Sequence, residues 1–174
     1  TGNKEFIRAI YVLDTSSNNT DTKREYIFAE KNKNLLDEVL KERIKIEKDN
    51  LNSTATLLQK QLYHFHETTK FSHNDIKPAN IGVRNVNKPN MEFKFIDLGS
   101  VTHESDSTDN LSFTMQYMSQ LDELSIHENR KKVDRWALGC SIYEMVCRSL
   151  NPGENEDDCT LFGSSKFMNS FVSV

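Results

Sequence analysis

One segment near the C-terminal end, VDRWALGCSIYEMVC (133–147), constrains the fold of this chain more than any other. Its apolar residues lie on nearly every side of a helix: Val133, Trp136, Ala137, Leu138, Cys140, Ile142, Tyr143, Met145 and Val146. A helix on a protein surface keeps a polar face, whereas a helix that is apolar nearly all round is covered by other elements. We therefore expect the helix over 133–147 to form the middle of the core.

Composition allows one packed domain and excludes several classes of partner. The 174 residues are 36% hydrophobic and carry a net charge of −4, which is typical of a globular chain. Acids and bases are interspersed, which argues against nucleic acid as a partner, and no apolar run reaches the ~18 residues that cross a membrane. Cys140, Cys147 and Cys159 lack the spacing of metal ligands. They predict reduced thiols and an intracellular protein, cytoplasmic or nuclear.

The N-terminal part of the chain predicts two strands followed by a helix. Residues 5–14 and 24–30 are rich in Ile, Val, Tyr and Phe and are separated by a polar stretch, so we expect an antiparallel pair. From Leu35 onward, apolar residues recur at helical spacing, and the charges at 41–49 are expected to form a solvated face.

A further helix is expected over 53–71, with Ser53 and Thr54 as N-caps. Its apolar face carries Leu58, Leu62 and Phe65. His64 and His66 lie two residues apart, so on a helix they face different ways. We expect them to have packing or surface roles and not to bind a metal.

The motif HNDIKPAN (73–80) sets an acid, a cation and an amide at close intervals, as Asp75, Lys77 and Asn80. It follows a helix and precedes a short apolar strand (81–83), so these side chains are expected on a braced loop. Phosphoryl transfer needs a positioned nucleophile, charge compensation and metal ligands more than covalent help, and these residue types suit it. Asn80 offers a hard oxygen that Mg²⁺ accepts, but one amide cannot hold the metal alone.

A second oxygen ligand is available at Asp97. The segment 91–97 alternates as a strand and is expected to pair with 81–85 through the turn-rich NVNKPN, while Gly99 lets the chain turn away. This hairpin would place Asn80 and Asp97 side by side. An Asp such as Asp75 or Asp97, taken alone, more often caps a turn. The prediction of a metal site therefore depends on the two acids and Asn80 occurring together.

Four motifs in this order resemble the protein kinase family. HNDIKPAN is similar to its H-R-D-x-K-x-x-N catalytic loop, DLG to its D-F-G metal-binding turn, TMQYMSQL to the end of its activation segment, and VDRWALGCSIYEM to its buried central helix. Four motifs in register over 71–146 form a specific signal. The resemblance implies an α+β fold: a mostly α-helical C-terminal lobe with a short β-hairpin at the catalytic cleft, and two residual strands of the small N-terminal lobe.

The resemblance also implies roles for single residues. Asp75 would orient the substrate hydroxyl and accept its proton. Lys77 would neutralise charge on the ATP phosphoryl group, and a Lys there is typical of serine/threonine kinases. Asn80 and Asp97 would hold Mg²⁺ ions that bridge the phosphates of ATP. Thr114 would help to fix the substrate residue.

Four further residues would support the site. His73 would brace the catalytic loop from the interior, and Asp134 would accept hydrogen bonds from the backbone of that loop. Glu30 and Lys31 would lie at the hinge between the lobes, where backbone groups meet the adenine of ATP.

The resemblance divides the chain into three regions: strands of the small lobe and hinge at 1–34, the large lobe at 35–150, and an acidic loop with an incomplete tail at 151–174. The expected parts of the large lobe are the catalytic loop (73–80), the activation segment (97–121) and the central helix (133–147).

Several positions depart from the family pattern. Asn74 replaces an Arg that usually pairs with a phosphate on the activation loop, so we expect activity not to be switched in that way. Leu98 replaces a Phe, a change that a hydrophobic slot tolerates, and Gly82 replaces a large aliphatic residue of the adenine floor. Ser119-Gln120-Leu121 replaces the Ala-Pro-Glu anchor. The polar stretch 98–112 is expected to form a long loop.

The chain contains no glycine-rich loop and no candidate for the strand Lys that grips the phosphates. This predicts a large lobe without most of the small one, which exposes apolar surface open to self-association. We expect the chain alone not to turn over ATP.

Three functions are compatible with these observations. The leading hypothesis is a serine/threonine protein kinase that uses ATP and Mg²⁺ to phosphorylate a protein substrate. A small-molecule kinase of the choline or aminoglycoside type shares the H-x-D…N loop but lacks the DIKPAN lysine pattern. A pseudokinase or scaffold is favoured by the eroded anchors and opposed by the intact acids, lysine and amide of the two motifs.

Overall fold

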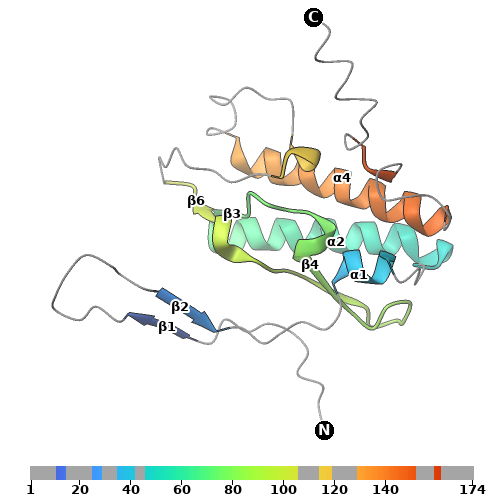
Figure 1. The fold of residues 1–174 in the computed structure, drawn as a ribbon, viewed down its shortest axis with the longest axis horizontal. Coiled ribbons are helices and arrows are strands. Elements are labelled where there is room, and N and C mark those ends of the chain that lie inside the picture. Colours follow the sequence, from blue (N-terminus) through green and yellow to red (C-terminus); the bar gives the residue numbers. More distant parts are fainter. Residues whose placement is uncertain are drawn as a thin grey trace, which may run out of the picture. The chain divides into compact units, whose positions relative to one another are not determined.

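A computed structural model of the chain describes residues 11–14, 25–28, 35–41, 46–105, 114–118, 129–151 and 159–161 (Figure 1). The chain divides into two units, Thr1–Lys33 and Asn34–Val174. In the first unit, β1 (Tyr11–Asp14) and β2 (Glu25–Phe28) pair antiparallel, with Tyr11 opposite Phe28. This confirms the predicted antiparallel pair. Its assignment to a small lobe stays a prediction, as do the three predicted regions.

The second unit is mostly helical. It contains α1 (Leu36–Lys41), α2 (Lys48–Thr69) and α4 (Arg130–Leu150), and α2 and α4 pack side by side (Figure 1). Two antiparallel pairs complete it: β3 (Phe71–Ser72) with β6 (Thr102–His103), and β4 (Ile81–Arg84) with β5 (Glu92–Phe95). The predicted hairpin is therefore present.

The core lies between α1, α2, α4 and the β4–β5 hairpin. Its most deeply buried side chains are Leu36, Leu58, Leu62, Ile81, Val83, Phe93 and Met145. Val83 and Phe93 are direct partners across the hairpin, which places their side chains on the same buried face. Burying side chains of this size stabilises the unit by roughly 1.5–3 kcal/mol each. The hairpin that carries Asn80 at one end is thus fixed to the core.

The predicted helix caps are wrong. Helix α2 begins at Lys48 with Glu47 at the N-cap position, so Ser53 and Thr54 lie inside the helix. Thr54 is fully buried, and the Ser53 hydroxyl donates a hydrogen bond to the Asn50 carbonyl at 2.8 Å. Ser and Thr hydroxyls satisfy this local pattern within helices as well as at caps, so the residue type alone did not locate the start.

Helix α4 covers the predicted range, but it is not buried on every side. Trp136 and Tyr143 are 42% and 46% exposed, and Asp134 and Glu144 are buried instead. The buried acids have hydrogen-bond partners, which removes the cost of placing them inside. At these positions the buried face of α4 therefore differs from the one that hydrophobicity alone predicts, because acids lie inside and aromatic side chains outside.

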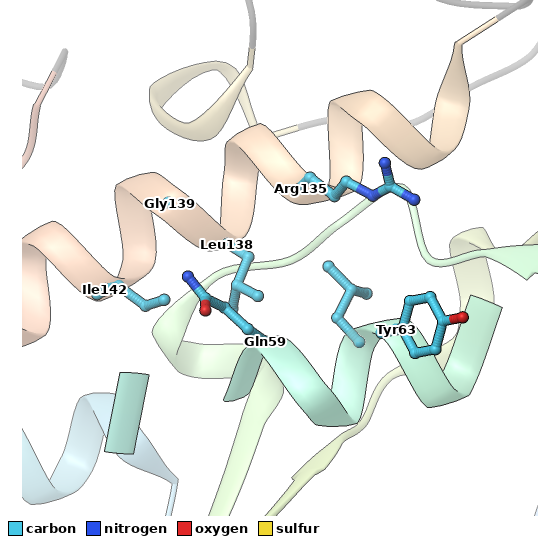
Figure 2. Close-up of a pocket in the computed structure, with 7 residues that line it drawn as sticks. Gln59, Tyr63, Arg135, Leu138, Gly139 and Ile142 are labelled. Carbon is cyan, nitrogen blue, oxygen red and sulfur yellow. The ribbon is translucent and has the colours of Figure 1, made fainter. Parts of the chain in front are cut away.

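An apolar groove runs between α2 and α4. Its volume is about 300 Å³, and it is lined by Gln59, Leu62, Tyr63, Arg135, Leu138, Gly139 and Ile142 (Figure 2). Within the described ranges, no helix is long and apolar enough to cross a membrane.

The polar stretch 98–112 is not one long loop. It contains a 3₁₀ turn at Leu98–Ser100 and strand β6, which pairs with β3 next to the catalytic loop. Leu98 is 44% exposed, so none of the described residues forms the expected hydrophobic slot around this side chain. Residues 106–112 lie outside the described part of the chain.

Cys147 and Cys159 form a disulfide, and Cys140 is a free, buried cysteine. The prediction of three reduced thiols is therefore wrong for two of them, because the fold brings residues twelve positions apart together at the end of α4. The intracellular location stays a prediction, and the disulfide removes part of its basis.

Thiol labelling tests this arrangement. In denaturant without reductant we expect one reactive thiol per chain, and three after reduction, since the chain has three cysteines. In the native state Cys140 should react slowly even at pH 8, because burial raises its pKa to about 11 and the thiolate is the reactive form. Three reactive thiols in unreduced, denatured chain would contradict the disulfide.

Candidate active site

The loop 73–80 is held at both ends. Before it, α2 ends at Thr69, and the C-cap residue Lys70 has a left-handed backbone (φ 60°) and donates its N–H to the His66 carbonyl, a standard helix stop. At its other end, a 3₁₀ turn at Pro78–Asn80 runs directly into β4. The loop therefore connects an amphipathic helix, through the short strand β3, with the buried strand β4.

Asp134 is the centre of the loop's support. Its carboxylate accepts the backbone N–H of His73 at 2.7 Å and that of Asn74 at 2.8 Å. The same carboxylate accepts a hydrogen bond from the His66 ring at 2.8 Å, and both side chains are almost fully buried. These contacts confirm the expectation that Asp134 binds the loop backbone. They also show that His66 has the packing role expected of it, whereas His64 is exposed.

His73 ties the loop to the end of β5. Its Nε2–H donates to the Ile96 carbonyl at 3.0 Å, and the side chain is fully buried. Burial lowers the pKa of His73 below its ordinary value, against the opposing effect of Asp134. The neutral ring with hydrogen on Nε2 therefore braces the loop from the interior, as the sequence predicts.

Asp75, Lys77 and Thr114 form a closed ring of contacts. The Thr114 hydroxyl donates to Asp75 Oδ1 at 2.6 Å, Lys77 Nζ donates to the Thr114 hydroxyl at 2.8 Å, and Lys77 Nζ pairs with Asp75 Oδ2 at 2.8 Å. Thr114 comes from a segment 39 positions downstream. The fold thus brings together the acid, cation and hydroxyl that the motifs predict.

The Asp75 carboxylate is ionised and nearly saturated with donors. Burial alone would raise its pKa, but hydrogen bonds from Lys77 and Thr114 outweigh burial and lower the pKa. Asn80 Nδ2 also donates to Oδ2 at 2.8 Å. A carboxylate offers about four lone-pair positions. Three are occupied here, which leaves one on Oδ1 for an incoming hydroxyl.

Asn80 is oriented as a metal ligand should be. Its amide nitrogen donates to Asp75 at both the backbone oxygen (2.9 Å) and the side chain, so its amide oxygen faces elsewhere. The backbone of Asn80 also accepts the Ile96 N–H at 3.0 Å, which brings the Asp97 position beside it. Amide and carboxylate oxygens are the hard donors that Mg²⁺ prefers, so these residues fit the metal.

Asp97 is exposed and sits in an unusual backbone conformation. Its φ is 61°, in the left-handed region, and no glycine in the described ranges has positive φ. The turn expected at Gly99 is therefore made by Asp97 itself, an allowed choice because Asp tolerates this region. A Cβ at Gly99 would lie 3.3 Å from Asp97 Oδ1, so glycine there leaves room for the carboxylate.

Asn80 and Asp97 alone cannot complete the octahedral shell of Mg²⁺. Over the part of the chain that is described, no three His, Cys, Asp or Glu residues gather to hold a metal ion. Asn80 and Asp97 would supply two oxygens, and phosphate and water would complete the shell.

Comparison with known proteins identifies the family, because residues 5–168 match the protein kinase domain. The chain belongs to the protein kinase family. The α+β fold, with a helical lobe and a hairpin beside the catalytic loop, agrees with this membership.

Three relatives are also protein kinases by name. A probable cAMP-dependent protein kinase catalytic subunit of Encephalitozoon cuniculi (strain GB-M1) is 36% identical over 73 residues, or 42% of this chain and 21% of the relative. Homeodomain-interacting protein kinase 1 of Caenorhabditis elegans is 31% identical over 87 residues (49% and 10%). Dual specificity protein kinase zak2 of Dictyostelium discoideum is 37% identical over 84 residues (42% and 12%). The kinase chain thus spans about a fifth or less of these relatives' lengths.

Asn74 has a role that sequence reasoning missed. Its Nδ2 donates to the Ser100 carbonyl at 2.6 Å and to the Thr102 hydroxyl at 2.9 Å. Its φ is 65°, a conformation that Asn adopts more readily than most residues. The side chain that replaces the family's Arg therefore ties the catalytic loop to the start of the activation segment without a phosphate.

A second missed feature anchors the end of the activation segment. The Tyr117 hydroxyl donates to Glu144 Oε2 at 2.6 Å in the interior. Arg148 donates to Glu144 Oε1 at 2.8 Å and to Asp37 of α1 at 3.4 Å. These contacts hold the end of the activation segment on α4, near the stretch that replaces the family's Ala-Pro-Glu anchor. Residues 119–121 of that stretch lie outside the described part of the chain. No local signal in the sequence predicts this contact, because Tyr117 and Glu144 are 27 positions apart.

Two predicted residues cannot be placed. Glu30 and Lys31, expected at the hinge, lie outside the described residues.

The space between the catalytic loop and α4 is nearly filled, since the cavity lined by Asp75, Thr114 and Asp134 measures about 10 Å³, room for about one water.

Proposed function

We propose that this kinase domain transfers the γ-phosphate of ATP to serine or threonine hydroxyls of protein substrates. The observation that carries the proposal is the closed ring of Asp75, Lys77 and Thr114. It joins an ionised base, a cation and a residue of the substrate-side segment at one point.

Each residue of the ring has a distinct task. The open position on Asp75 Oδ1 accepts the substrate hydroxyl and then its proton. Lys77, at 2.8 Å from Asp75, offsets the negative charge that builds on the transferred group. Thr114 lies between them and limits where the substrate chain can pass.

Asn80 and Asp97 would hold Mg²⁺ beside this ring. The metal, when bound, neutralises charge on the ATP phosphates. Asn80 links the two functions, because its amide nitrogen fixes Asp75 while its oxygen remains for the metal. Glu30 and Lys31 are proposed to meet adenine on the sequence pattern alone.

The decisive experiment compares acceptors. The chain, alone and in extended form within any longer protein that contains it, is incubated with Mg²⁺ and γ-labelled ATP. Acceptors are a peptide library with Ser, Thr or Tyr, choline and an aminoglycoside. We expect label on Ser and Thr peptides from the extended protein, none with EDTA, and none from the chain alone.

Other outcomes contradict the proposal in different ways. Label on choline or the aminoglycoside alone would favour the small-molecule kinase. Label on Tyr peptides alone would overturn the serine/threonine assignment. A folded, extended protein that binds Mg²⁺ and ATP but transfers no phosphate would favour the scaffold.

A further inference from the structure

A basic cavity lies at the start of α4, separate from the ring of Asp75. Its volume is about 320 Å³, and its lining residues are Ser72, Glu104, Asn129, Arg130, Lys131, Lys132 and Arg135. We call these residues the basic pocket. Four of them are cations and one is an acid, although the whole chain carries a net charge of −4. The positive charge is therefore concentrated locally and is not a property of the whole surface.

The positions of these cations oppose helix stability. Arg130, Lys131 and Lys132 are the first three residues of α4, and no acid lies in its first turn. The N-terminal end of a helix carries partial positive charge and favours acids. Three cations there raise the local potential and destabilise the helix end. A local rule broken in this way is expected at a functional site.

One anion already occupies part of the basic pocket. Glu104 Oε2 pairs with Lys131 Nζ at 3.0 Å, although Glu104 is mostly solvent-exposed. The hydrogen bond from Lys131 lowers the pKa of Glu104, and Lys70 and His103 act in the same direction. The potential that attracts this carboxylate would attract a second anion more strongly if that anion carried two charges.

Two further cations are accessible to such an anion. Lys132 and Arg135 are both exposed, and they lie one helical turn apart on neighbouring faces of α4. Figure 2 shows the Arg135 side chain extending along α4 toward its N-terminal end, away from Ile142. A guanidinium presents paired N–H donors that match two phosphate oxygens. Together, Arg135 and Lys132 can engage a dianionic phosphate.

The basic pocket is close to the catalytic loop. Ser72, in its lining, precedes Asp75 by three residues, so their Cα atoms are at most about 11 Å apart. A peptide whose hydroxyl reaches Asp75 can therefore place a side chain a few residues away in the pocket.

We propose that the basic pocket binds a phosphoserine or phosphothreonine side chain of the protein substrate, a few residues from the hydroxyl that is phosphorylated. The proposal rests on the proposed function and adds the substrate class to it: proteins that already carry a phosphate. A phosphoryl group has three acceptor oxygens and nearly two negative charges at pH 7, which suits a site built from Arg and Lys. Nucleic acid fits less well, because none of the described residues that line the pocket is aromatic and could stack on a base.

Binding is measured by fluorescence anisotropy with two labelled peptides that differ only in one phosphate on Ser. We expect the chain to bind the phosphopeptide at least about tenfold more tightly than the unmodified peptide, with affinity falling as salt rises. Lys132→Gln and Arg135→Gln should each weaken phosphopeptide binding about tenfold, the loss of one charge-assisted contact. Both residues are exposed, so the variants should fold, and urea unfolding checks this.

Lys60→Gln is the matched control, because Lys60 is an exposed lysine on α2 outside the basic pocket. It should leave phosphopeptide binding unchanged. Equal binding of the two peptides, or equal losses in Lys60→Gln and Lys132→Gln, would overturn the proposal. Tighter binding of a DNA oligonucleotide, lost in Lys132→Gln, would assign the pocket to nucleic acid instead.

Further measurements distinguish the substrate phosphate from other sources of phosphate. They also test the basic pocket and the proposed function separately. Inorganic phosphate that competes at the same concentration as the phosphopeptide would show that the peptide contributes nothing, against the proposal. If phosphorylation of Ser105 blocks peptide binding, and Lys132→Gln removes this effect, the pocket would instead bind the chain's own phosphorylated segment. Anisotropy needs no catalysis, so phosphopeptide binding without phosphotransfer by the extended protein would contradict the proposed function alone. Phosphotransfer without phosphate-dependent binding would contradict the pocket alone.

Discussion

Replacing Asp75 by Asn is expected to lower kcat of the catalytically active form of this kinase by ~10²–10⁴, the usual contribution of a positioned general base. The change keeps the size and shape of the side chain but removes its charge and its open acceptor position toward the substrate hydroxyl. Asn80 keeps its hydrogen bond to the Asp75 backbone oxygen at 2.9 Å, so its orientation toward the metal should persist. We therefore expect the KM for ATP to change little.

Steady-state kinetics on a phosphorylatable peptide give both parameters. Asp49→Asn is the control, because Asp49 is an exposed acid on α2, and it should leave kcat unchanged. A fall in kcat of less than about tenfold would mean that Asp75 is not the base. A large rise in the KM for ATP at unchanged kcat would make Asp75 a nucleotide-binding residue instead.

Replacing Asp134 by Ala is expected to lower the free energy of unfolding by about 3–5 kcal/mol, the usual cost of removing one member of a buried charged network. The carboxylate accepts two backbone N–H groups and one ring N–H. All three donors would lose their partner inside the protein, and each such loss carries a desolvation penalty. Urea unfolding followed by circular dichroism measures the difference.

Asp134→Asn keeps the experiment interpretable if the Ala variant does not fold. One side-chain oxygen remains to accept the Asn74 N–H, but the amide nitrogen would face the N–H groups of His73 and His66. We expect a loss of about 1–3 kcal/mol for the unsatisfied donors. Asp49→Ala, at the exposed start of α2, should cost less than about 1 kcal/mol. Equal costs for the two Ala variants would contradict the central role of Asp134.

The sequence was sufficient where one motif or one period determined the structure. Alternation and a turn-rich connection predicted the β4–β5 hairpin, and the hairpin brought the Asn80 and Asp97 positions together. The contacts of Asp134 and Thr114 were predicted by the resemblance to the protein kinase family. Prediction from sequence failed where polar groups satisfy one another in the interior. Glu144 is buried because Tyr117 and Arg148 meet it, and no local pattern links those three residues.

Glycine and cysteine show two further limits. Glycine is the commonest residue at positive φ, so the sequence predicts the turn after β5 at Gly99, whereas Asp97 adopts that conformation itself. The disulfide depends on the end of α4 returning to Cys159, which is a tertiary event. Neither outcome follows from the residue type at one position.

The bond between His66 and Asp134 has a consequence for how activity is lost. His66 belongs to α2, Asp134 to α4, and the catalytic loop is suspended from the same carboxylate. Separating the two helices would therefore dismantle the loop in the same step, so the region should melt as one cooperative unit. Hydrogen exchange at the amides of His73 and Asn74 would then proceed only through global opening, at the slow rate of the core.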